Sequence, residues 1–388
     1  MEILFWALVV AAAYPYAIYP VVVWICSRIF GRHGKRPAPK AEDWPTVSLL
    51  IVAHNEERLI NARIENALAT DYPPDKLQIV VASDGSTDAT VRIVERYGDR
   101  GVRCLPFNER RGKATTLRSA GEHLSGDVVV LSDANSFFRS DAVKMMARWF
   151  LEPSVGVVCG KLVLADRKQD KNCDGLYWRF ETMLKQAESR LGALLGSNGA
   201  IYSIRRRLIE HLPANAIVDD FELPLTAKMR TGCDLLFESR AIAEEETPSK
   251  ISSEFNRRSR IGAGVFQSLG RLYPLLNPMK GWIAFTFISH KVFRWIGPFL
   301  LVGLFVSNAF LIDQPLFQST MFLQVAFYLF ALLGLLMPVR AWPKIARLPA
   351  LFVTVNAALM VGFFKWMTGG NSAIWQPTKR TETVSHSA

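Results

Sequence analysis

Two acids, an amide and a lysine stand where they could bind a metal-bound diphosphate. Asp133 and Asn135 follow a β-branched apolar run and are one residue apart, and Asp84 ends an earlier apolar run. Lys113 comes directly after Gly112 at an expected helix start, a common arrangement for binding anions. Magnesium and manganese take few protein oxygens and complete their shells from phosphate and water. These residue types therefore predict a site for a metal-bound diphosphate.

The elements that must position these side chains alternate between strand and helix. Apolar runs predict four strands, at 46–53, 77–83, 102–105 and 126–132, and Asn55 is expected to cap the helix after the first strand. This alternation is typical of a doubly wound, mostly parallel α/β sheet, in which the carboxyl ends of the strands share one edge. The alternative is that each polar residue is a separate turn or cap, with Asp133 capping a helix at 140–150. A dinucleotide fold is disfavoured, because no Gly-x-Gly-x-x-Gly follows the first strand.

Composition indicates that part of the chain lies in a membrane. Half of its 388 residues are hydrophobic and the mean hydropathy is slightly positive. Three segments carry no charge and are long enough, or nearly so, to cross a bilayer as helices: Ile3–Ser27, Trp295–Ile312 and Pro315–Val339. A fourth segment, 349–364, has only 16 residues, and we expect it to lie along the membrane without crossing.

The first segment could be mistaken for a cleaved signal peptide, since it contains Ala11-Ala12-Ala13. However, no basic residue precedes it, and Arg28 and Arg32 follow it. The positive-inside rule then places the N-terminus outside and the soluble part in the cytoplasm. We therefore expect a protein of the bacterial inner membrane with three spans.

The net charge of +11 raises the question of a nucleic-acid partner. Much of the excess lies beside the apolar segments, where it suits anionic lipid headgroups, and no RNA-binding or zinc-finger signature accompanies it. We therefore expect membrane lipids as partners and no nucleic acid. The five cysteines are odd in number and form no Cys-x-x-Cys pair, which favours reduced thiols in the cytosol.

Seven short motifs occur in the order found in family 2 glycosyltransferases. They are Ala53-His54-Asn55-Glu56-Glu57, Ser83-Asp84-Gly85-Ser86-Thr87-Asp88, Arg111-Gly112-Lys113, Ser132-Asp133-Ala134-Asn135, Gly196-Ser197-Asn198-Gly199-Ala200, Val218-Asp219-Asp220 and Arg257-Arg258-Ser259-Arg260. The chain thus resembles the membrane-bound branch related to cellulose, hyaluronan and poly-N-acetylglucosamine synthases. The resemblance implies a glycosyltransferase-A-like mixed sheet with N- and C-terminal transmembrane helices.

The same resemblance assigns substrate and metal roles. It implies that Asp84 meets the nucleotide base, and that the other substrate-binding residues are Asn55, Glu56, Lys113, Asn198, Gly199 and Arg257. Asp133 and Asn135 hold the place of the family's Asp-x-Asp metal motif, for Mg²⁺ or Mn²⁺. Asn135 departs from the pattern, because a neutral amide binds a hard cation less strongly than a carboxylate.

The pair Asp219 and Asp220 matches the family's acidic pair, whose second member is the general base. Pro224 supports a helix start at this pair, since proline is tolerated in the first turn, and Gly232 is expected to end that helix. The alternative is that one Asp, chiefly Asp219, caps the helix. The resemblance implies inversion at the anomeric carbon, with the metal and Arg258 or Arg260, both candidate catalytic residues, neutralising the leaving diphosphate.

A second departure concerns processivity. Arg257 and Ile261 replace the glutamine and tryptophan of the polymerising synthases' Gln-x-x-Arg-Trp, and isoleucine offers no flat face to a sugar. Single-sugar transfer to a lipid-linked acceptor and growth of a polysaccharide therefore both stay open. The alternative for these arginines is contact with lipid headgroups.

The expected organisation has six parts: an N-terminal transmembrane helix (1–29), a linker (30–45), a cytoplasmic catalytic domain (46–265), an interfacial amphipathic region (266–294), a C-terminal membrane region (295–367) and a tail (368–388). The predicted function is transfer of a sugar from a nucleotide-diphosphate sugar to a growing polysaccharide or a lipid-linked acceptor. A catalytically inactive membrane adaptor that keeps the fold for binding or assembly is the alternative. A transporter is disfavoured, because the few spans offer no charged pathway.

Overall fold

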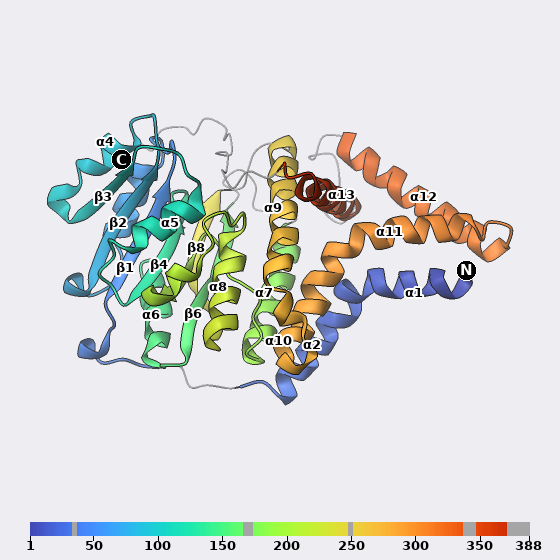
Figure 1. The fold of residues 1–388 in the computed structure, drawn as a ribbon, viewed down its shortest axis with the longest axis horizontal. Helices are drawn as coiled ribbons and strands as arrows, with labels where there is room; N and C mark the ends of the chain where they lie inside the picture. Colours follow the sequence, from blue (N-terminus) through green and yellow to red (C-terminus); the bar gives the residue numbers. More distant parts are fainter. Residues whose placement is uncertain (33–36, 166–173, 247–250, 337–346, 371–388) are drawn as a thin grey trace. The chain divides into compact units, whose positions relative to one another are not determined.

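A computed structural model of the chain describes residues 1–32, 37–165, 174–246, 251–336 and 347–370 (Figure 1). The chain divides into two compact units, and each is described by itself. The first is built on a sheet and takes in residues 30–168 and 185–250, and the second consists of helices from residues 1–29, 169–184 and 251–371. This division differs from the expected domain boundary at residue 265, because the helix that begins at Ile251 belongs to the helical unit.

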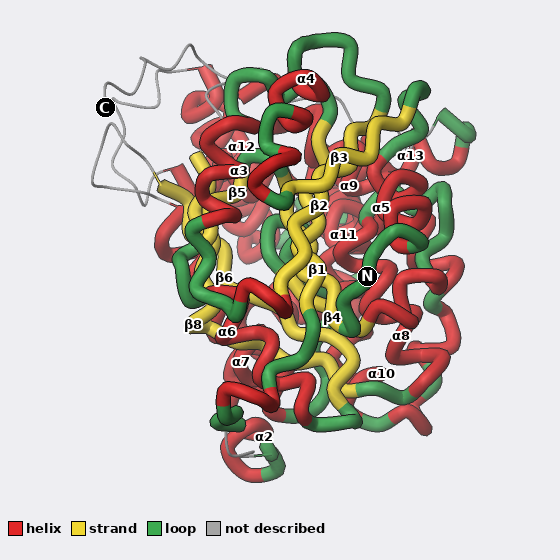
Figure 2. The backbone as a smooth tube through the Cα atoms, turned by 90° about the vertical axis from the view of Figure 1, so that its left-hand side faces the viewer, coloured by secondary structure: helices red, strands yellow, loops and turns green. Residues whose placement is uncertain are grey.

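The sheet unit contains one mixed sheet of eight strands, drawn in yellow in Figure 2. The strands are β1 (Val47–Ala53), β2 (Leu77–Asp84), β3 (Val102–Phe107), β4 (Val128–Asp133), β5 (Ser136–Phe138), β6 (Val155–Ala165), β7 (Tyr202–Arg205) and β8 (Asp234–Glu246), in the order β3-β2-β1-β4-β7-β6-β8-β5. The four predicted strands are β1 to β4, and they are parallel. β7 runs antiparallel to β4 and β6, and β5 runs antiparallel to β8. The predicted mixed α/β fold class is confirmed.

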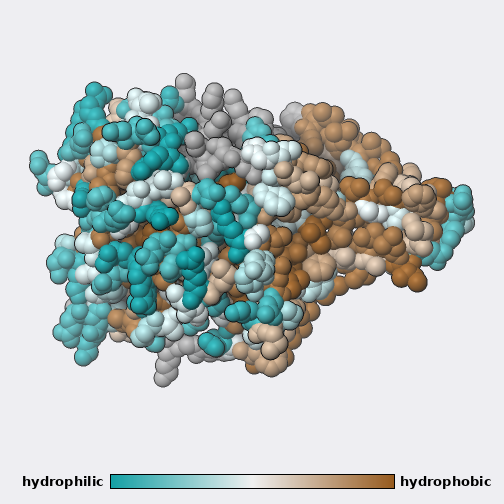
Figure 3. Space-filling model, in the orientation of Figure 1, coloured by the Kyte–Doolittle hydropathy of each residue, from teal (hydrophilic) through white to brown (hydrophobic). Residues whose placement is uncertain are grey.

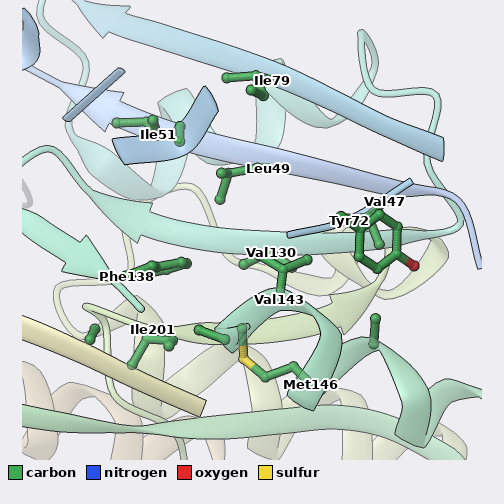
Figure 4. Packing of buried hydrophobic residues seen from close by; sticks show 14 of the residues in the cluster. Val47, Leu49, Ile51, Tyr72, Ile79, Val130, Phe138, Val143, Met146 and Ile201 are labelled. Carbon is green, nitrogen blue, oxygen red and sulfur yellow. The ribbon is translucent and has the colours of Figure 1, made fainter. Parts of the chain in front are cut away.

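The centre of the sheet is buried because its strands are apolar on both faces. All seven residues of β1 are buried, as expected for a parallel strand covered by helices on both sides. Leu49, Ile51 and Val130 pack in one cluster with Val143 and Met146 from a covering helix (Figure 4). Full burial of each such side chain contributes roughly 1.5–3 kcal/mol, so this cluster fixes the strands that carry the site.

The helices of the sheet unit are α3 (Ile60–Leu68), α4 (Thr90–Glu95), α5 (Lys113–Gly121), α6 (Ala142–Ala147), α8 (Asp219–Thr231) and the end of α7 (Asp174–Arg190) from residue 185 on. One prediction and one alternative about helix starts are wrong. Asn55 does not cap α3, which begins only at Ile60 without a side-chain cap. Asp133 does not cap α6 either, since strand β5 intervenes and the helix begins at Ala142.

The helical unit consists of α1 (Glu2–Ala13), α2 (Tyr19–Ile29), α9 (Ile251–Arg271), α10 (Trp282–Thr286), α11 (Phe293–Ala309), α12 (Pro315–Leu336), α13 (Leu348–Met367) and α7 up to residue 184, with π-helical turns at Tyr14–Ile18 and Phe287–Val292. In the described residues, four stretches are long and apolar enough to cross a membrane, namely Glu2–Ile29, Trp282–Ala309, Pro315–Leu336 and Leu348–Met367. The outward side chains of α11 and α12 are mostly hydrophobic (Figure 3).

Two of these stretches differ from the sequence prediction. Helix α13 has 20 residues against the predicted 16, so shortness no longer argues against its crossing. Trp282 lies at the start of a continuous 28-residue helical stretch, whereas we expected an interfacial segment up to Arg294. The tail segment 375–380 resembles a further element of the family, with an interfacial anchor as the alternative, and it lies outside the described residues.

Candidate active site

The register of the sheet brings two of the predicted acids to one edge. Val52 of β1 pairs with Asp133 of β4, and Ala53 pairs with Ser83 of β2, which Asp84 follows directly. Asp84 and Asp133 therefore end the two strands on either side of β1. The carboxyl edge of an open α/β sheet is where such folds bind ligands.

Asp84 is buried and its carboxylate is bound by the chain itself. Its Oδ1 accepts from the backbone N–H of Arg111 (2.8 Å) and the hydroxyl of Thr116 (2.9 Å), and its Oδ2 accepts from the N–H of Gly112 (2.9 Å). Gly112 adopts φ +89°, which side chains rarely allow. Asp84 thus builds the turn that begins α5 and places Lys113. Its predicted contact with a nucleotide base stays a prediction.

Lys113 joins the two acidic motifs. Its Nζ lies 2.7 Å from Asp133 Oδ1 and 3.5 Å from Asp219 Oδ2. Burial by itself lowers the pKa of Lys113, but the charges of Asp133 and Asp219 outweigh burial, so its pKa is raised above the ordinary value. The lysine is therefore a cation held between two carboxylates at this edge of the sheet.

Helix α8 begins at the predicted acidic pair. Its N-cap is Val218 and it ends at Gly232, whose φ of +71° is left-handed as predicted. Asp219 is the first helical residue and makes no capping bond, so the capping alternative is wrong. Burial raises the pKa of Asp219 to about 6, with Lys113 opposing the rise and Asp220 adding to it.

The position of Pro224 explains how Asp220 is held. Pro224 is the sixth helical residue, not a first-turn residue, and its missing N–H leaves the carbonyl of Asp220 without its helical donor. Ser197 fills this place, since both its N–H and its hydroxyl donate to that carbonyl at 2.8 Å. The N–H of Gly199 donates to Asp220 Oδ2 at 2.9 Å. The segment around 197–199 therefore fixes both the backbone and the carboxylate of Asp220.

Two glycines make this close approach possible. A Cβ on Gly199 would lie 3.2 Å from Asp220 Oδ2, and one on Gly196 would lie 3.0 Å from the Phe221 ring. Gly196 also has φ +81°. Between them, Asn198 accepts a hydrogen bond from Lys185 of α7 and donates to the Gly160 carbonyl at 2.6 Å. The roles of Asn198 and Gly199 in substrate binding stay predictions.

Asn55 has the left-handed φ of +54°, which is uncommon outside glycine. Its Oδ1 accepts from the N–H of Thr87 at 2.8 Å, and its own N–H donates to Ser86. The N–H of Glu56 donates to the Thr90 hydroxyl at 2.9 Å. These bonds join the loops that follow β1 and β2, so Asn55 and Glu56 lie at the same edge as Asp84.

Asn135 has a partner that the sequence did not reveal. Its Nδ2 donates to Glu245 of β8, which lies 110 positions further along the chain. The carboxylate oxygens of Asp133 and the amide oxygen of Asn135 are of the type that a hard divalent cation prefers. Among the described residues, no three His, Cys, Asp or Glu side chains gather to hold a metal. Asp133 and Asn135 offer two side-chain oxygens that fit such a cation, and their role as metal ligands stays a prediction.

Two further buried residues at this site were also missed. The Tyr202 hydroxyl is buried and has no hydrogen-bond partner in the part of the chain that the structure describes. Burial raises its pKa well above the ordinary value, and the acids Asp219, Asp220 and Asp133 add to this. Arg63 is fully buried and donates to Ser132, next to Asp133, at 3.0 Å. Neither lies in a motif, so no local signal marks them.

The three predicted arginines lie on α9 of the helical unit, with Arg257 exposed and Arg258 and Arg260 half-buried. This helix packs tightly on α13, because a Cβ on Gly362 would lie 2.7 Å from the backbone of Gly262. The roles of the arginines toward a leaving group or an acceptor stay predictions.

Comparison with known proteins first defines the class of fold. The mannosyltransferase PcManGT from Pyrobaculum calidifontis, solved in complex with GDP-Man and Mn²⁺, matches with a TM-score of 0.70 at 23% identity, covering 94% of this chain and 98% of that one. The chain therefore has a glycosyltransferase-A-like fold.

The family follows from the sequence match. A family model described as "Glycosyltransferase like family 2" matches residues 45–264, and the chain belongs to this family. Relatives include the probable glycosyltransferase YdaM of Bacillus subtilis (strain 168), 26% identical over 69% of this chain and 68% of that protein. An N-acetylglucosaminyltransferase of Rhizobium sp. (strain N33) is 29% identical over 44% of this chain and only 40% of its own length. The predicted enzyme class, a glycosyltransferase, is confirmed.

Proposed function

We propose that the protein is a membrane-bound, inverting glycosyltransferase. It transfers a sugar from a nucleotide-diphosphate sugar to a hydroxyl of a saccharide or lipid-linked acceptor. The observation that carries this proposal is the setting of Asp220. One oxygen of its carboxylate is held by the N–H of Gly199, and its neighbour Asp219 is joined through Lys113 to Asp133 at the sheet edge.

The chemistry requires a base near a nucleotide site. A sugar hydroxyl is a poor nucleophile until its proton is removed, and a fixed carboxylate can take that proton as the new C–O bond forms. Asp220 is fixed in this way, because Gly199 and Ser197 hold its carboxylate and its carbonyl. Attack on the face opposite the departing diphosphate inverts the anomeric carbon. Lys113 is positioned to attract the diphosphate, and we assign Arg258 and Arg260 to neutralising its charge.

Asp133 and Asn135 would hold a divalent cation, Mg²⁺ or Mn²⁺. When bound, such a cation stabilises the negative charge of the leaving diphosphate. The presence of Mn²⁺ in the complex of the fold relative supports this assignment. Asp219 keeps Lys113 next to Asp133, so the two acidic motifs act on the same end of the donor.

The four long apolar helices support a location in the membrane. The basic residues Arg28 and Arg32 after the first of them favour a catalytic domain in the cytoplasm of a bacterium, at the inner membrane. Membrane lipids are then permanent neighbours, and a lipid-linked acceptor is within reach of the membrane.

The test is to incubate the full-length protein in lipid nanodiscs with UDP-glucose, UDP-N-acetylglucosamine or GDP-mannose and Mn²⁺, and to measure the released nucleotide. Saccharide and glycolipid acceptors are added in turn. We expect release with one donor that depends on the acceptor. Binding of a donor without any turnover across the panel would instead identify an inactive adaptor.

A further inference from the structure

Asn135 stands where the family's metal motif has a second carboxylate, and the fold brings a carboxylate to it from another strand. β5 pairs antiparallel with β8, with Ser136 opposite Glu245. The residue before Ser136 is Asn135, and its Nδ2 donates to Glu245 Oε1. This contact joins the end of the metal motif to the end of β8.

The contact determines which way the amide faces. A carboxylate only accepts hydrogen bonds, so it selects the nitrogen of the Asn135 amide and turns the oxygen away from itself. A charged acceptor also makes this bond stronger than one between neutral groups, and it polarises the amide toward a more negative oxygen. The pair Asn135 and Glu245 carries one negative charge, the same as the single carboxylate that the motif lacks.

We propose that Glu245 is a positioning residue for the divalent cation. It holds Oδ1 of Asn135 in the orientation for ligation. Its negative charge, acting through the amide, takes the place of the charge that a second Asp would bring to the metal motif. The inference rests on the proposed function, because the cation concerned is the one that accompanies the nucleotide diphosphate. Partners of this kind, which orient a ligand without touching the metal, typically change metal affinity about 10- to 100-fold when replaced.

The chain offers a matched control in the adjacent residue. Glu244 is exposed, lies opposite Phe137 in the same strand pair and has Arg139 at 3.7 Å. Glu244→Gln therefore removes the same charge one position away, from a side chain that points to the other face of the strand. Any general effect of lost charge at the end of β8 should appear in both variants.

The experiment measures Mn²⁺ affinity without relying on turnover. Full-length wild type, Glu245→Gln, Glu244→Gln and the exchange Asn135→Asp/Glu245→Gln are purified in nanodiscs, and each is titrated with Mn²⁺ in saturating UDP and, in parallel, GDP. Electron paramagnetic resonance of free Mn²⁺ gives the dissociation constant. Thermal unfolding without Mn²⁺ checks the fold of each variant.

We expect Glu245→Gln to weaken Mn²⁺ binding about tenfold or more, while Glu244→Gln stays within about twofold of wild type. The exchange variant should regain wild-type affinity, since it keeps the hydrogen bond and the charge with the two groups reversed. Equal affinities for the two single variants, or no recovery in the exchange variant, would overturn the inference. If Glu245→Gln does not fold, Glu245→Asp decides, because it keeps the charge but shortens the side chain that reaches the Asn135 amide; an Mn²⁺ affinity equal to that of Glu244→Asp would overturn the inference.

The outcome also separates this inference from the proposed function. If wild-type protein fails to bind Mn²⁺ in the presence of UDP and also in the presence of GDP, the proposed function is contradicted, and the inference with it. Wild-type protein that binds Mn²⁺ normally, with Glu245→Gln equal to Glu244→Gln, would contradict the inference alone.

Discussion

Pro224 and Asp220 are related by the hydrogen bond that proline cannot make. In a regular helix the N–H of residue 224 would donate to the carbonyl of Asp220, but here Ser197 donates to it twice. Because Pro224 leaves the Asp220 carbonyl without its helical donor, the segment around 197–199 can bind there. The same segment binds the Asp220 carboxylate through the N–H of Gly199. The proline that removes one helical hydrogen bond therefore also creates the contact that positions the proposed base.

Asp220→Asn should abolish transfer while leaving nucleotide binding intact. The amide oxygen can still accept from Gly199, so the local structure is kept, but the group no longer takes a proton. We expect kcat to fall by roughly a hundredfold to ten-thousandfold. Released nucleotide gives kcat, and Asp99→Asn on the exposed turn Gly98–Arg100 serves as the matched control. Near-normal turnover by the variant would show that Asp220 is not the base.

Gly199→Ala should disturb the same carboxylate without removing it. The added Cβ would lie 3.2 Å from Asp220 Oδ2, so the carboxylate must move by a few tenths of an ångström. Small displacements of a reacting group are costly, and we expect kcat to fall about tenfold to a hundredfold with the donor KM little changed. Gly98→Ala is the control, because an added Cβ there meets nothing within 4 Å. Equal kcat for both variants would contradict the assigned geometry.

The raised pKa of Asp219 predicts that the free energy of unfolding depends on pH. Its pKa in the folded protein is about 6, against an ordinary value of 3.8, chiefly because of burial. A raised acid pKa means that the folded state binds the proton more tightly than the unfolded state does. The proton on Asp219 therefore contributes fully to the free energy of unfolding below about pH 4, and this contribution is lost as pH rises to about 6. Asp219→Asn cannot titrate there, and wild type should lose up to about 3 kcal/mol relative to it over that range.

Unfolding of both proteins, followed in detergent at pH 4 to 7, measures this difference. The slope of this difference with pH is the quantity to compare, because the substitution also changes the contact between residue 219 and Lys113. A difference that stays constant across the range would show that Asp219 is already ionised at pH 4.

Tyr202→Phe should separate stability from activity. Its buried hydroxyl has no partner among the described residues, and removing an unsatisfied polar group costs the fold nothing. Because buried donors are nearly always satisfied in the working state, we expect the hydroxyl to bond to substrate. The variant should keep or raise Tm and lose about tenfold in kcat/KM, the value of one hydrogen bond to a charged group. Unchanged kcat/KM would assign Tyr202 to packing alone.

The topology prediction now has two competing forms. Four helices are long enough to cross, which places the chain end outside, whereas Lys365 near the end of α13 and the charge bias favour the cytoplasm. We keep the three-span prediction. Gly370→Cys, in a background without the native cysteines, adds a side chain just after α13 at ordinary contact distances, since a Cβ there would lie 3.7 Å from Thr368 Oγ1 and 3.8 Å from the Lys365 carbonyl. It should resist an impermeant maleimide in intact cells and react after lysis, and labelling of intact cells would establish four spans.

The sequence by itself determined the features that depend on a few adjacent residues. Apolar β-branched runs marked β1 to β4, and the acids after them came to the predicted edge, because a parallel strand ends where its apolar run ends. The end of α8 at Gly232 was also predictable, since glycine favours that position, whereas its start at Asp219 was predicted from Pro224, which lies beyond the first turn.

Only the tertiary structure decided which partners these residues take. Asn55 looked like a helix cap, yet it bridges to Thr87 on another loop. Asp220 is held by Gly199, 21 positions earlier, and Asn135 by Glu245, 110 positions later. Such pairs depend on strand register and on how loops dock, and one slip of register changes every partner. Local propensity carries no information about these distant choices, so the acids of the site were predictable and their hydrogen bonds were not.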